Sequence, residues 1–272
     1  MLKTRVLTAV ILAPIAIALV FFAPMWMFRL TAALLMMIGC WEFHRLAMLK
    51  SAATWLLFSL QAGLIILMHL NWDTLSAYSG PILMAACIAW TLMFLRLAGN
   101  HENQDAGGRF QAASFVSALV AITSCWFALC WLRDQTHGEY LILLLLIIIW
   151  AADVGAYFSG RAFGKTKLAP VISPKKTWEG VAGGVILAAI TALLLSKFVP
   201  GTDISLFALM SLTAVTVMTS ICGDLFISLH KRTVKLKDAG SLFPGHGGVL
   251  DRLDSLLPGS VFFAMGIWIL RS

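Results

Sequence analysis

Long apolar runs alternate with short polar connections along the whole chain. Each run is about 20 residues long, enough to cross a hydrocarbon layer of about 30 Å as an α-helix. The pattern predicts an all-α, polytopic integral membrane protein with about nine transmembrane helices. The predicted spans are Val6–Ala23, Leu30–Ala47, Trp55–Leu70, Pro81–Leu97, Ala112–Leu132, Tyr140–Gly160, Gly180–Val199, Ser205–Phe226 and Val249–Leu270.

The composition supports this class, because 60% of the residues are hydrophobic, only 12% are charged and the mean hydropathy is +0.89. These values exclude an ordinary soluble globular domain. The first span is long and has no small-x-small cleavage site before Pro24, so we expect a retained helix and not a secretory signal. No linker separates two soluble domains. We divide the chain into N-terminal transmembrane helices, residues 1–139, and a C-terminal catalytic region, residues 140–272.

The five cysteines fall in or beside apolar spans and show no CxxC spacing. We therefore expect core-filling side chains, with no disulfide framework and no zinc site. They are Cys40, Cys87, Cys125, Cys130 and Cys222.

Lysine and arginine are distributed unevenly between the two sets of connections. With the N-terminus inside, 16 of the 20 basic residues are cytoplasmic, and the other side has only Arg29, Arg133, Lys197 and Arg271. Short loops rich in lysine and arginine stay cytoplasmic, so the long basic loops at residues 160–180 and 231–255 are predicted to face the cytoplasm. Topology and contact with anionic headgroups account for Lys3, Arg5, Arg45 and Lys50.

Two acidic residues in the apolar spans have structural explanations, although a carboxylate at membrane depth is by default a functional candidate. Glu42 lies one helical turn from Arg45, so we expect an ion pair within the helix. Asp153 precedes Gly155 and Ser159, small residues that allow another helix to approach closely. For Asp153, a structural hydrogen bond and a role in a site are equally compatible with the sequence.

Asp224 is the strongest site candidate among the acidic residues. On a continuing helix it shares a face with Ser228 and Lys231. Asp251 and Asp254 follow the glycine-rich turn, at the start of the last span.

Carboxylates alternating with basic residues suggest phosphate handled through a divalent metal. Magnesium prefers hard oxygen ligands and is usually held by one or two carboxylates plus substrate phosphates. Asp224 and Asp251 could supply these ligands, with Asp254 or Asp153 as further candidates. The alternative is a salt-bridge network that joins two helix ends.

Two segments have features of phosphate binding. The residues Pro244–Gly248, "PGHGG", permit positive φ angles and close approach of backbone amides to an anion, or they form only a turn before a helix. His246 could bond a phosphate oxygen or cap that turn. In "SPKKTWEG", Ser173 is placed to cap a helix with Pro174 at its first position. Lysines in that first turn, Lys175 and Lys176, would be unfavourable unless an anion were bound there.

The segment "SLHKRTVKLKDAGSLFPGHGGVLDRLD", Ser228–Asp254, resembles the C-terminal signature of the phosphatidate cytidylyltransferase (CDP-diacylglycerol synthase) family. The resemblance extends through "CGDLF" to "ADVGAYFSGRAFGKTKLAPVISPKKTWEG", and so covers roughly the C-terminal half. It implies transfer of a cytidylyl group from CTP to phosphatidic acid, giving CDP-diacylglycerol and pyrophosphate for phospholipid biosynthesis.

Two positions depart from the family pattern. Ile227 stands where members usually carry a glutamate, which puts a polar contact of the site in doubt, and His230 stands where they usually carry an apolar residue.

The resemblance also implies roles for individual residues. Asp224 and Asp251 would hold Mg²⁺, with K⁺ as a possible second cation. The catalytic residues would be Asp224, Asp251, Lys231 and Arg232. The substrate-binding residues would be Ser173, Lys175, Lys176, Ser228, Lys237, Asp238, His246, Gly247, Gly248, Arg252 and Asp254.

The expected partners are CTP, phosphatidic acid and membrane lipids, without nucleic acid; a homodimer stays open. The expected location is the bacterial inner membrane, with the site facing the cytoplasm. Three alternatives stay open: a CTP-dependent lipid or polyprenol kinase, which would release CDP; a paralogue with altered activity; and a transporter using Asp153 and Asp224. Transporters often contain inverted repeats, and the sequence has none that we detect.

Overall fold

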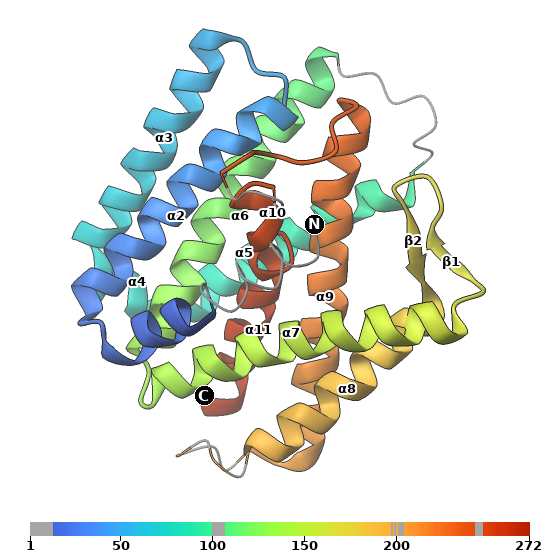
Figure 1. The fold of residues 1–272 in the computed structure, drawn as a ribbon. Coiled ribbons are helices and arrows are strands. Elements are labelled where there is room, and N and C mark those ends of the chain that lie inside the picture. The colour runs from blue at the N-terminus through green and yellow to red at the C-terminus, as the bar shows by residue number, and fades with distance from the viewer. Residues whose placement is uncertain (1–12, 100–106, 197, 199, 201–203, 243–246) are drawn as a thin grey trace.

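Helices make up nearly all the regular structure of the computed structural model, which describes residues 13–99, 107–196, 198, 200, 204–242 and 247–272 (Figure 1). The described residues contain one two-stranded antiparallel hairpin, in which Lys167 pairs with Thr177 and Ala169 with Ser173. The elements are α2 (Met25–Leu46), α3 (Ser51–Leu70), α4 (Trp72–Ala77), α5 (Ser79–Phe94), η1 (Leu95–Ala98), α6 (Gly108–Asp134), α7 (Gly138–Phe163), β1 (Lys167–Ala169), β2 (Ser173–Thr177), α8 (Trp178–Ser196), α9 (Leu206–Thr233), α10 (Leu250–Leu253) and α11 (Leu256–Arg271).

The predicted all-α membrane architecture is confirmed. Eight helical segments in the described part of the chain are long and apolar enough to cross a membrane, and they match the second to ninth predicted spans. The predicted first span, Val6–Ala23, begins in residues 1–12, which lie outside the described residues; its remaining part contains the short apolar helix Ala13–Phe22. The cysteines are free and buried, except that Cys222 is partly buried, as expected of core-filling side chains.

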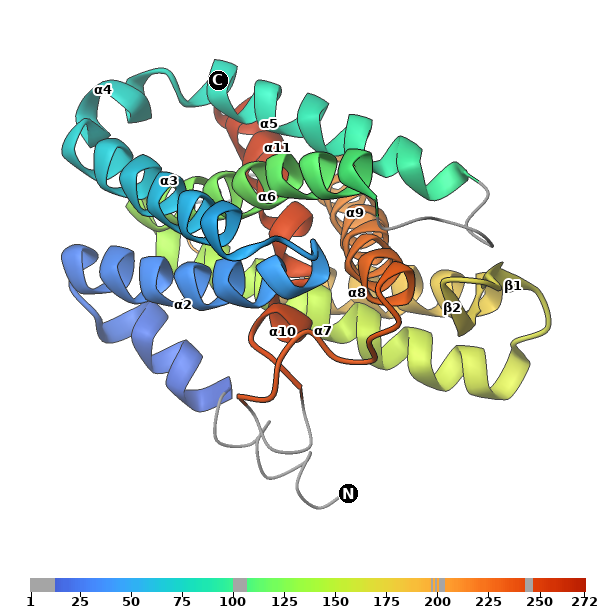
Figure 2. The same ribbon diagram turned by 90° about the horizontal axis from the view of Figure 1, so that it is seen from above.

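The site elements meet around α9. α11 packs against α5, α6 and α9, while α8 packs against α7 and α9. Seen from above, α9 lies between α5 and the pair α7 and α8 (Figure 2). Because α11 also contacts helices before residue 140, the C-terminal region is packed against the N-terminal helices. The proposed division into residues 1–139 and 140–272 stays a prediction.

Small residues bring α7 and α8 into close contact, as predicted from Gly155 and Ser159. A Cβ atom at Gly155 would overlap the carbonyl oxygen of Gly183, and one at Gly183 would overlap the Ser159 side chain. The Ser159 hydroxyl donates to the carbonyl oxygen of Glu179 at 2.9 Å. With only small side chains between the backbones, van der Waals contact and this hydrogen bond can hold two membrane helices together.

Gly183→Val is expected to destabilise the fold, since the new side chain has no room beside Ser159. Overpacking of this kind costs about 1–3 kcal/mol, which corresponds to a decrease in Tm of roughly 2–12 °C for a chain of this size. Thermal unfolding in detergent measures this change. Gly63→Val in α3 is the matched control, because no atom lies within 4 Å of a Cβ built at Gly63. Equal Tm values for the two variants would contradict the close contact between α7 and α8.

Three arginines assigned to the non-cytoplasmic side lie in one polar cluster near the C-terminus. Arg29 Nη2 lies 3.6 Å from Asp134 Oδ1, and Arg133 Nη1 lies 3.5 Å from Glu139 Oε2. Arg271 donates to the carbonyl oxygen of Thr136 at 3.4 Å. The fourth member of that set, Lys197, lies outside the described residues. Arginines from three distant segments thus gather at one end of the bundle, and the side of the membrane that this end faces stays a prediction.

Candidate active site

The end of α9 carries three polar residues at the helical spacing that the sequence indicated. Ser228 Oγ donates to Asp224 Oδ1 at 3.2 Å, across one turn of the helix. Lys231 is buried, and its Nζ donates to Asp251 Oδ1 at 2.8 Å. The helix continues past the predicted end at Phe226, so the start of the basic stretch 231–255 is helical.

The second strand supplies the cation that pairs with Asp224. Lys176 Nζ lies 2.5 Å from Asp224 Oδ2, and the two side chains are 28% and 30% exposed. Lys175, the preceding residue, is exposed and lines the same cavity as Lys176. The basic loop and α9 therefore form one site, although spacing along the chain could not show that Lys176 and Asp224 meet.

The prediction that Ser173 caps a helix is wrong. Ser173 begins β2 and pairs with Ala169, and α8 begins only at Trp178. The N-terminal cap is Thr177, whose Oγ1 accepts a hydrogen bond from the Gly180 amide at 3.2 Å. The two lysines therefore precede the helix in a strand, and the argument from its first turn does not apply to them.

Apolar contacts and one hydrogen bond hold the hairpin against α9. Ile172, between the strands, is buried with Leu225 and Leu229 of α9. Arg232 Nε donates to the carbonyl oxygen of Ile172 at 3.3 Å. Arg232 thus fastens the loop that carries Lys176, a role that its position in the signature did not indicate.

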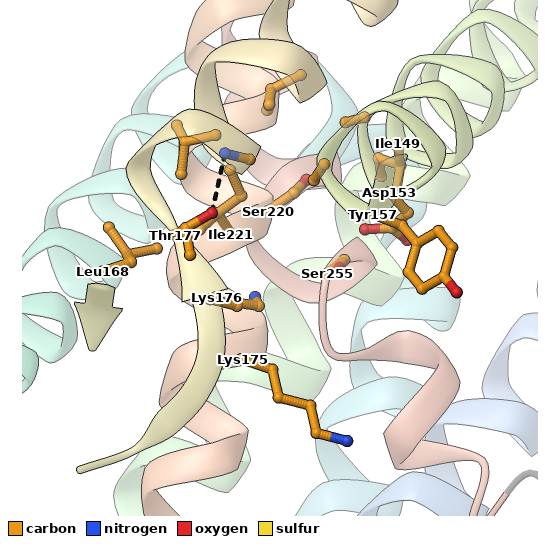
Figure 3. A pocket seen from close by; sticks show the side chains of 15 residues that line it. Ile149, Asp153, Tyr157, Leu168, Lys175, Lys176, Thr177, Ser220, Ile221 and Ser255 are labelled. Atoms are coloured by element: carbon orange, nitrogen blue, oxygen red, sulfur yellow. Dashed lines mark hydrogen bonds between the residues drawn. The ribbon is translucent and has the colours of Figure 1, made fainter. Parts of the chain in front are cut away.

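A cavity of about 230 Å³ lies beside Lys176. In Figure 3, β2 carries Lys175 and Lys176 along one side of the cavity, and α7 carries Asp153 and Tyr157 on the other. Much of the remaining lining is apolar, with side chains such as Ile149, Val181, Val217 and Ile221. One cavity therefore combines charged groups with an apolar wall, which suits an amphipathic molecule.

Two further carboxylates interact electrostatically with Asp224. Asp153 is within range of electrostatic interaction with Asp224, Lys176 and Arg252. Asp254 interacts in the same way with Asp224, Lys176 and Lys231, and it accepts a hydrogen bond from the Ser255 amide at 2.8 Å. Asp153 also lines the cavity, so it lies where a role in the site would place it.

Asp251 is held more tightly than Asp224. Its side chain is 6% exposed, Oδ1 accepts from Lys231, and Oδ2 accepts from the amides of Ala239 at 2.8 Å and Gly248 at 2.9 Å. Gly247 adopts a positive φ of 83°, as the glycine-rich segment predicted. In the described residues, the Gly248 amide thus binds a carboxylate of the protein.

The remaining predicted residues surround this core. Lys237 and Asp238 are exposed in the connection after α9, and Arg252 is exposed in α10. The β-carbon of Asp238 lies beside Gly247. His246 lies outside the described residues, so both hypotheses about it stay predictions.

The two departures from the family signature lie in packed surroundings. Ile227 is fully buried in the hydrophobic core and does not line the cavity. His230 is 1% exposed, donates from Nδ1 to the carbonyl oxygen of Phe226 at 2.9 Å, and packs against the rings of Phe43, Phe110 and Phe226. Both side chains therefore contribute to packing behind the site.

The expected ion pair between Glu42 and Arg45 is wrong. Among the described residues Glu42 has no ion pair within 4.0 Å, and Arg45 is exposed. The buried Glu42 carboxylate accepts hydrogen bonds from the amides of Val249 at 3.1 Å and Leu250 at 2.7 Å. The sequence signal was a carboxylate in an apolar span, but its partners are more than 200 positions away.

The residues present are compatible with magnesium. The described part of the chain has no group of three histidine, cysteine or acidic side chains arranged to hold a metal ion. Magnesium usually needs only one or two carboxylates, because water and substrate phosphates complete its coordination. Asp224 is partly exposed, and Asp153 and Asp254 interact with it electrostatically. This concentration of hard oxygen donors fits a magnesium ion shared with phosphate.

Fold and site together define a polytopic membrane protein with a charged, partly apolar cavity at the junction of its helices. The model of the Cytidylyltransferase family matches residues 3–270, and the chain belongs to that family. It is 35% identical to a phosphatidate cytidylyltransferase of Pseudomonas aeruginosa over 98% of this chain and 97% of the relative. It is 36% identical to one of Haemophilus influenzae, over 97% and 98% of the two chains. A third relative with the same name, from Staphylococcus saprophyticus, is 32% identical over 94% and 95%.

Proposed function

We propose that this protein is a phosphatidate cytidylyltransferase, which transfers the cytidylyl group of CTP to phosphatidic acid and releases pyrophosphate. The observation that carries the proposal is the pairing of Lys176 with Asp224 beside a cavity with an apolar wall. A phospholipid substrate needs charged partners for its phosphate group and an apolar surface for its acyl chains. The full-length similarity to relatives named for this activity supports the same conclusion.

The reaction is an in-line displacement at the α-phosphorus of CTP. A phosphate oxygen of phosphatidic acid forms the new bond, and the bond between the α-phosphorus and the bridging oxygen breaks, so that the electron pair leaves with pyrophosphate. The attacking oxygen is already anionic and needs no general base. Catalysis then depends on positioning the substrates and stabilising their charge.

The cations of the site fit this requirement, and two of them, Lys175 and Lys176, line the cavity. Lys175, Lys176 and Lys231 would neutralise the triphosphate and the lipid headgroup, with Arg232 and Arg252 at the edge of the site. Asp224 would keep Lys176 in place until phosphate oxygens are present.

Mg²⁺ would be held by Asp224 and Asp251, and when bound it supplies positive charge to the phosphate oxygens. For Asp224 this role is supported by its partial exposure and the neighbouring Asp153 and Asp254. Asp251 remains a proposed Mg²⁺ ligand through its Oδ1 atom, which in this structure accepts a hydrogen bond from Lys231. A second cation such as K⁺ also remains a proposal.

The proposed location is the inner membrane of a bacterium, with the cavity facing the cytoplasm. Water-soluble CTP and a lipid can meet only at the membrane surface. The bacterial relatives and the distribution of basic residues support this orientation. Contacts with other membrane lipids and a homodimer remain proposals.

Product analysis tests the reaction. Purified protein with CTP, phosphatidic acid and Mg²⁺ is expected to release pyrophosphate only when both substrates are present. Release of CDP without pyrophosphate would instead indicate a CTP-dependent kinase and would overturn the proposal.

A further inference from the structure

Glu42 joins α2 to the glycine-rich connection at the site, although it lies in the half of the chain outside the signature. Its side chain is buried, since the residue is only 6% exposed. Both carboxylate oxygens are used: Oε1 accepts from the Val249 amide and Oε2 from the Leu250 amide. A buried carboxylate is costly unless it is compensated, so these two amides must be maintained for Glu42 to stay in place.

The connection encloses this carboxylate at both of its ends. A Cβ atom built at Gly240 or at Gly248 would overlap the carboxyl group of Glu42. A Cβ atom built at Gly39, one turn earlier in α2, would lie 3.9 Å from the side chains of Leu250 and Leu253. The carboxylate therefore fits between the chain entering the connection and the chain leaving it.

Asp251 holds the same two chain positions through other atoms. Its Oδ2 accepts from the amides of Ala239 and Gly248, which directly precede Gly240 and Val249. A shift of either chain end would therefore disturb the contacts of both carboxylates. Because Asp251 Oδ1 accepts from Lys231, such a shift would also move the lysine.

We propose that Glu42 is a positioning residue for cytidylyl transfer. It holds residues 239–240 and 248–250, the two described ends of the connection, so that Asp251 and Lys231 keep their orientation toward the phosphates. This inference rests on the proposed function, since it assigns Asp251 and Lys231 to the transfer site. In this role Glu42 acts through Asp251 and Lys231 and not by contact with a substrate.

The decisive variant is Glu42→Gln, which keeps the size of the side chain. A glutamine presents only one acceptor oxygen, and its NH₂ group would face a backbone amide, donor against donor. We expect kcat to fall about 10-fold to 100-fold, the range seen when residues behind a metal ligand are changed. The KM for phosphatidic acid is expected to stay within about twofold, and half-maximal activity to require several-fold more Mg²⁺.

A second readout does not depend on activity. Lys235 and Lys237 are exposed in the connection, so brief trypsin treatment of folded protein should cut there faster in Glu42→Gln than in wild type. Arg45→Ala, an exposed position on the same helix, is the control and should match wild type in both assays. Gly240→Ala is a second variant, in which the new methyl group would push against the Glu42 carboxylate without removing its charge. It is expected to behave like Glu42→Gln.

The outcomes separate the two proposals. If wild type transfers cytidylyl groups and Glu42→Gln keeps the wild-type kcat, Mg²⁺ dependence and trypsin resistance, the positioning role is overturned. If wild type shows no transfer at all, the proposed function fails. The trypsin assay then still tests whether Glu42 holds the connection: faster cleavage of Glu42→Gln than of wild type supports this, and equal cleavage contradicts it. If Glu42→Gln does not fold, Gly240→Ala decides the question by the same measurements.

Discussion

Asp224→Asn is expected to lower the rate of cytidylyl transfer by about 100-fold or more, the scale seen when one charge-stabilising group is removed from an active site. Asparagine preserves the shape but removes the negative charge that pairs with Lys176 and would hold Mg²⁺. The neighbouring Ser228 would keep a hydrogen-bond acceptor, so we expect little loss of stability. Transfer rate and Tm should be measured on the same preparation.

Asp73→Asn is the matched control for this prediction. Asp73 is exposed in α4, away from the cavity-lining helices, and its variant is expected to retain wild-type activity. Comparable activity in the two variants would show that the carboxylate of Asp224 has no part in the reaction.

Lys231→Met is expected to reduce both stability and activity. The lysine is 8% exposed and the Asp251 side chain 6% exposed, so the substitution leaves a buried carboxylate without its cation. Breaking a buried ion pair costs about 3–5 kcal/mol, equivalent to a decrease in Tm of roughly 6–20 °C. Thermal unfolding in detergent measures the loss, and Lys165→Met, at an exposed lysine, should leave Tm nearly unchanged.

A double variant distinguishes loss of the pair from general disruption. Lys231→Met and Asp251→Asn remove the same interaction, so their combined cost should be smaller than the sum of the single costs. Additive costs would mean that the two side chains stabilise the fold independently, contrary to the 2.8 Å contact between them.

The transmembrane helices were largely predictable, because apolar runs of sufficient length have few other stable conformations. The end of α9 was less predictable, since Lys231 and Arg232 resemble the start of a polar loop. They remain helical because Lys231 reaches Asp251 and Arg232 reaches the hairpin at Ile172. The helix end therefore depends on tertiary contacts that hydropathy does not register.

The hairpin illustrates a different limit of local patterns. Ser173 followed by proline has the local features of a helix start, yet the segment pairs with β1 and is anchored by Ile172 on α9. Thr177 is also a preferred capping residue, and it lies where the strand ends. Both Ser173 and Thr177 could cap the helix, and only the pairing of Ser173 with β1 shows that Thr177 does so.

For the site, the signature indicated which residues belong together but not which atoms meet. Asp224 and Ser228 were placed on one helical face, and their hydrogen bond followed directly from that spacing. The partners of Lys176 and Glu42 come from distant segments, so no local pattern could identify them. Glu42 had a plausible local partner in Arg45, and that nearer explanation was wrong.

The most direct test of the central claim follows the α-phosphate of CTP. Purified protein in detergent is incubated with phosphatidic acid, Mg²⁺ and CTP labelled at the α-phosphorus, and wild type is compared with Asp251→Asn. We predict label in the lipid fraction with wild type and a strong reduction with the variant. Folded wild-type protein that transfers no label to lipid would contradict the assignment as a phosphatidate cytidylyltransferase.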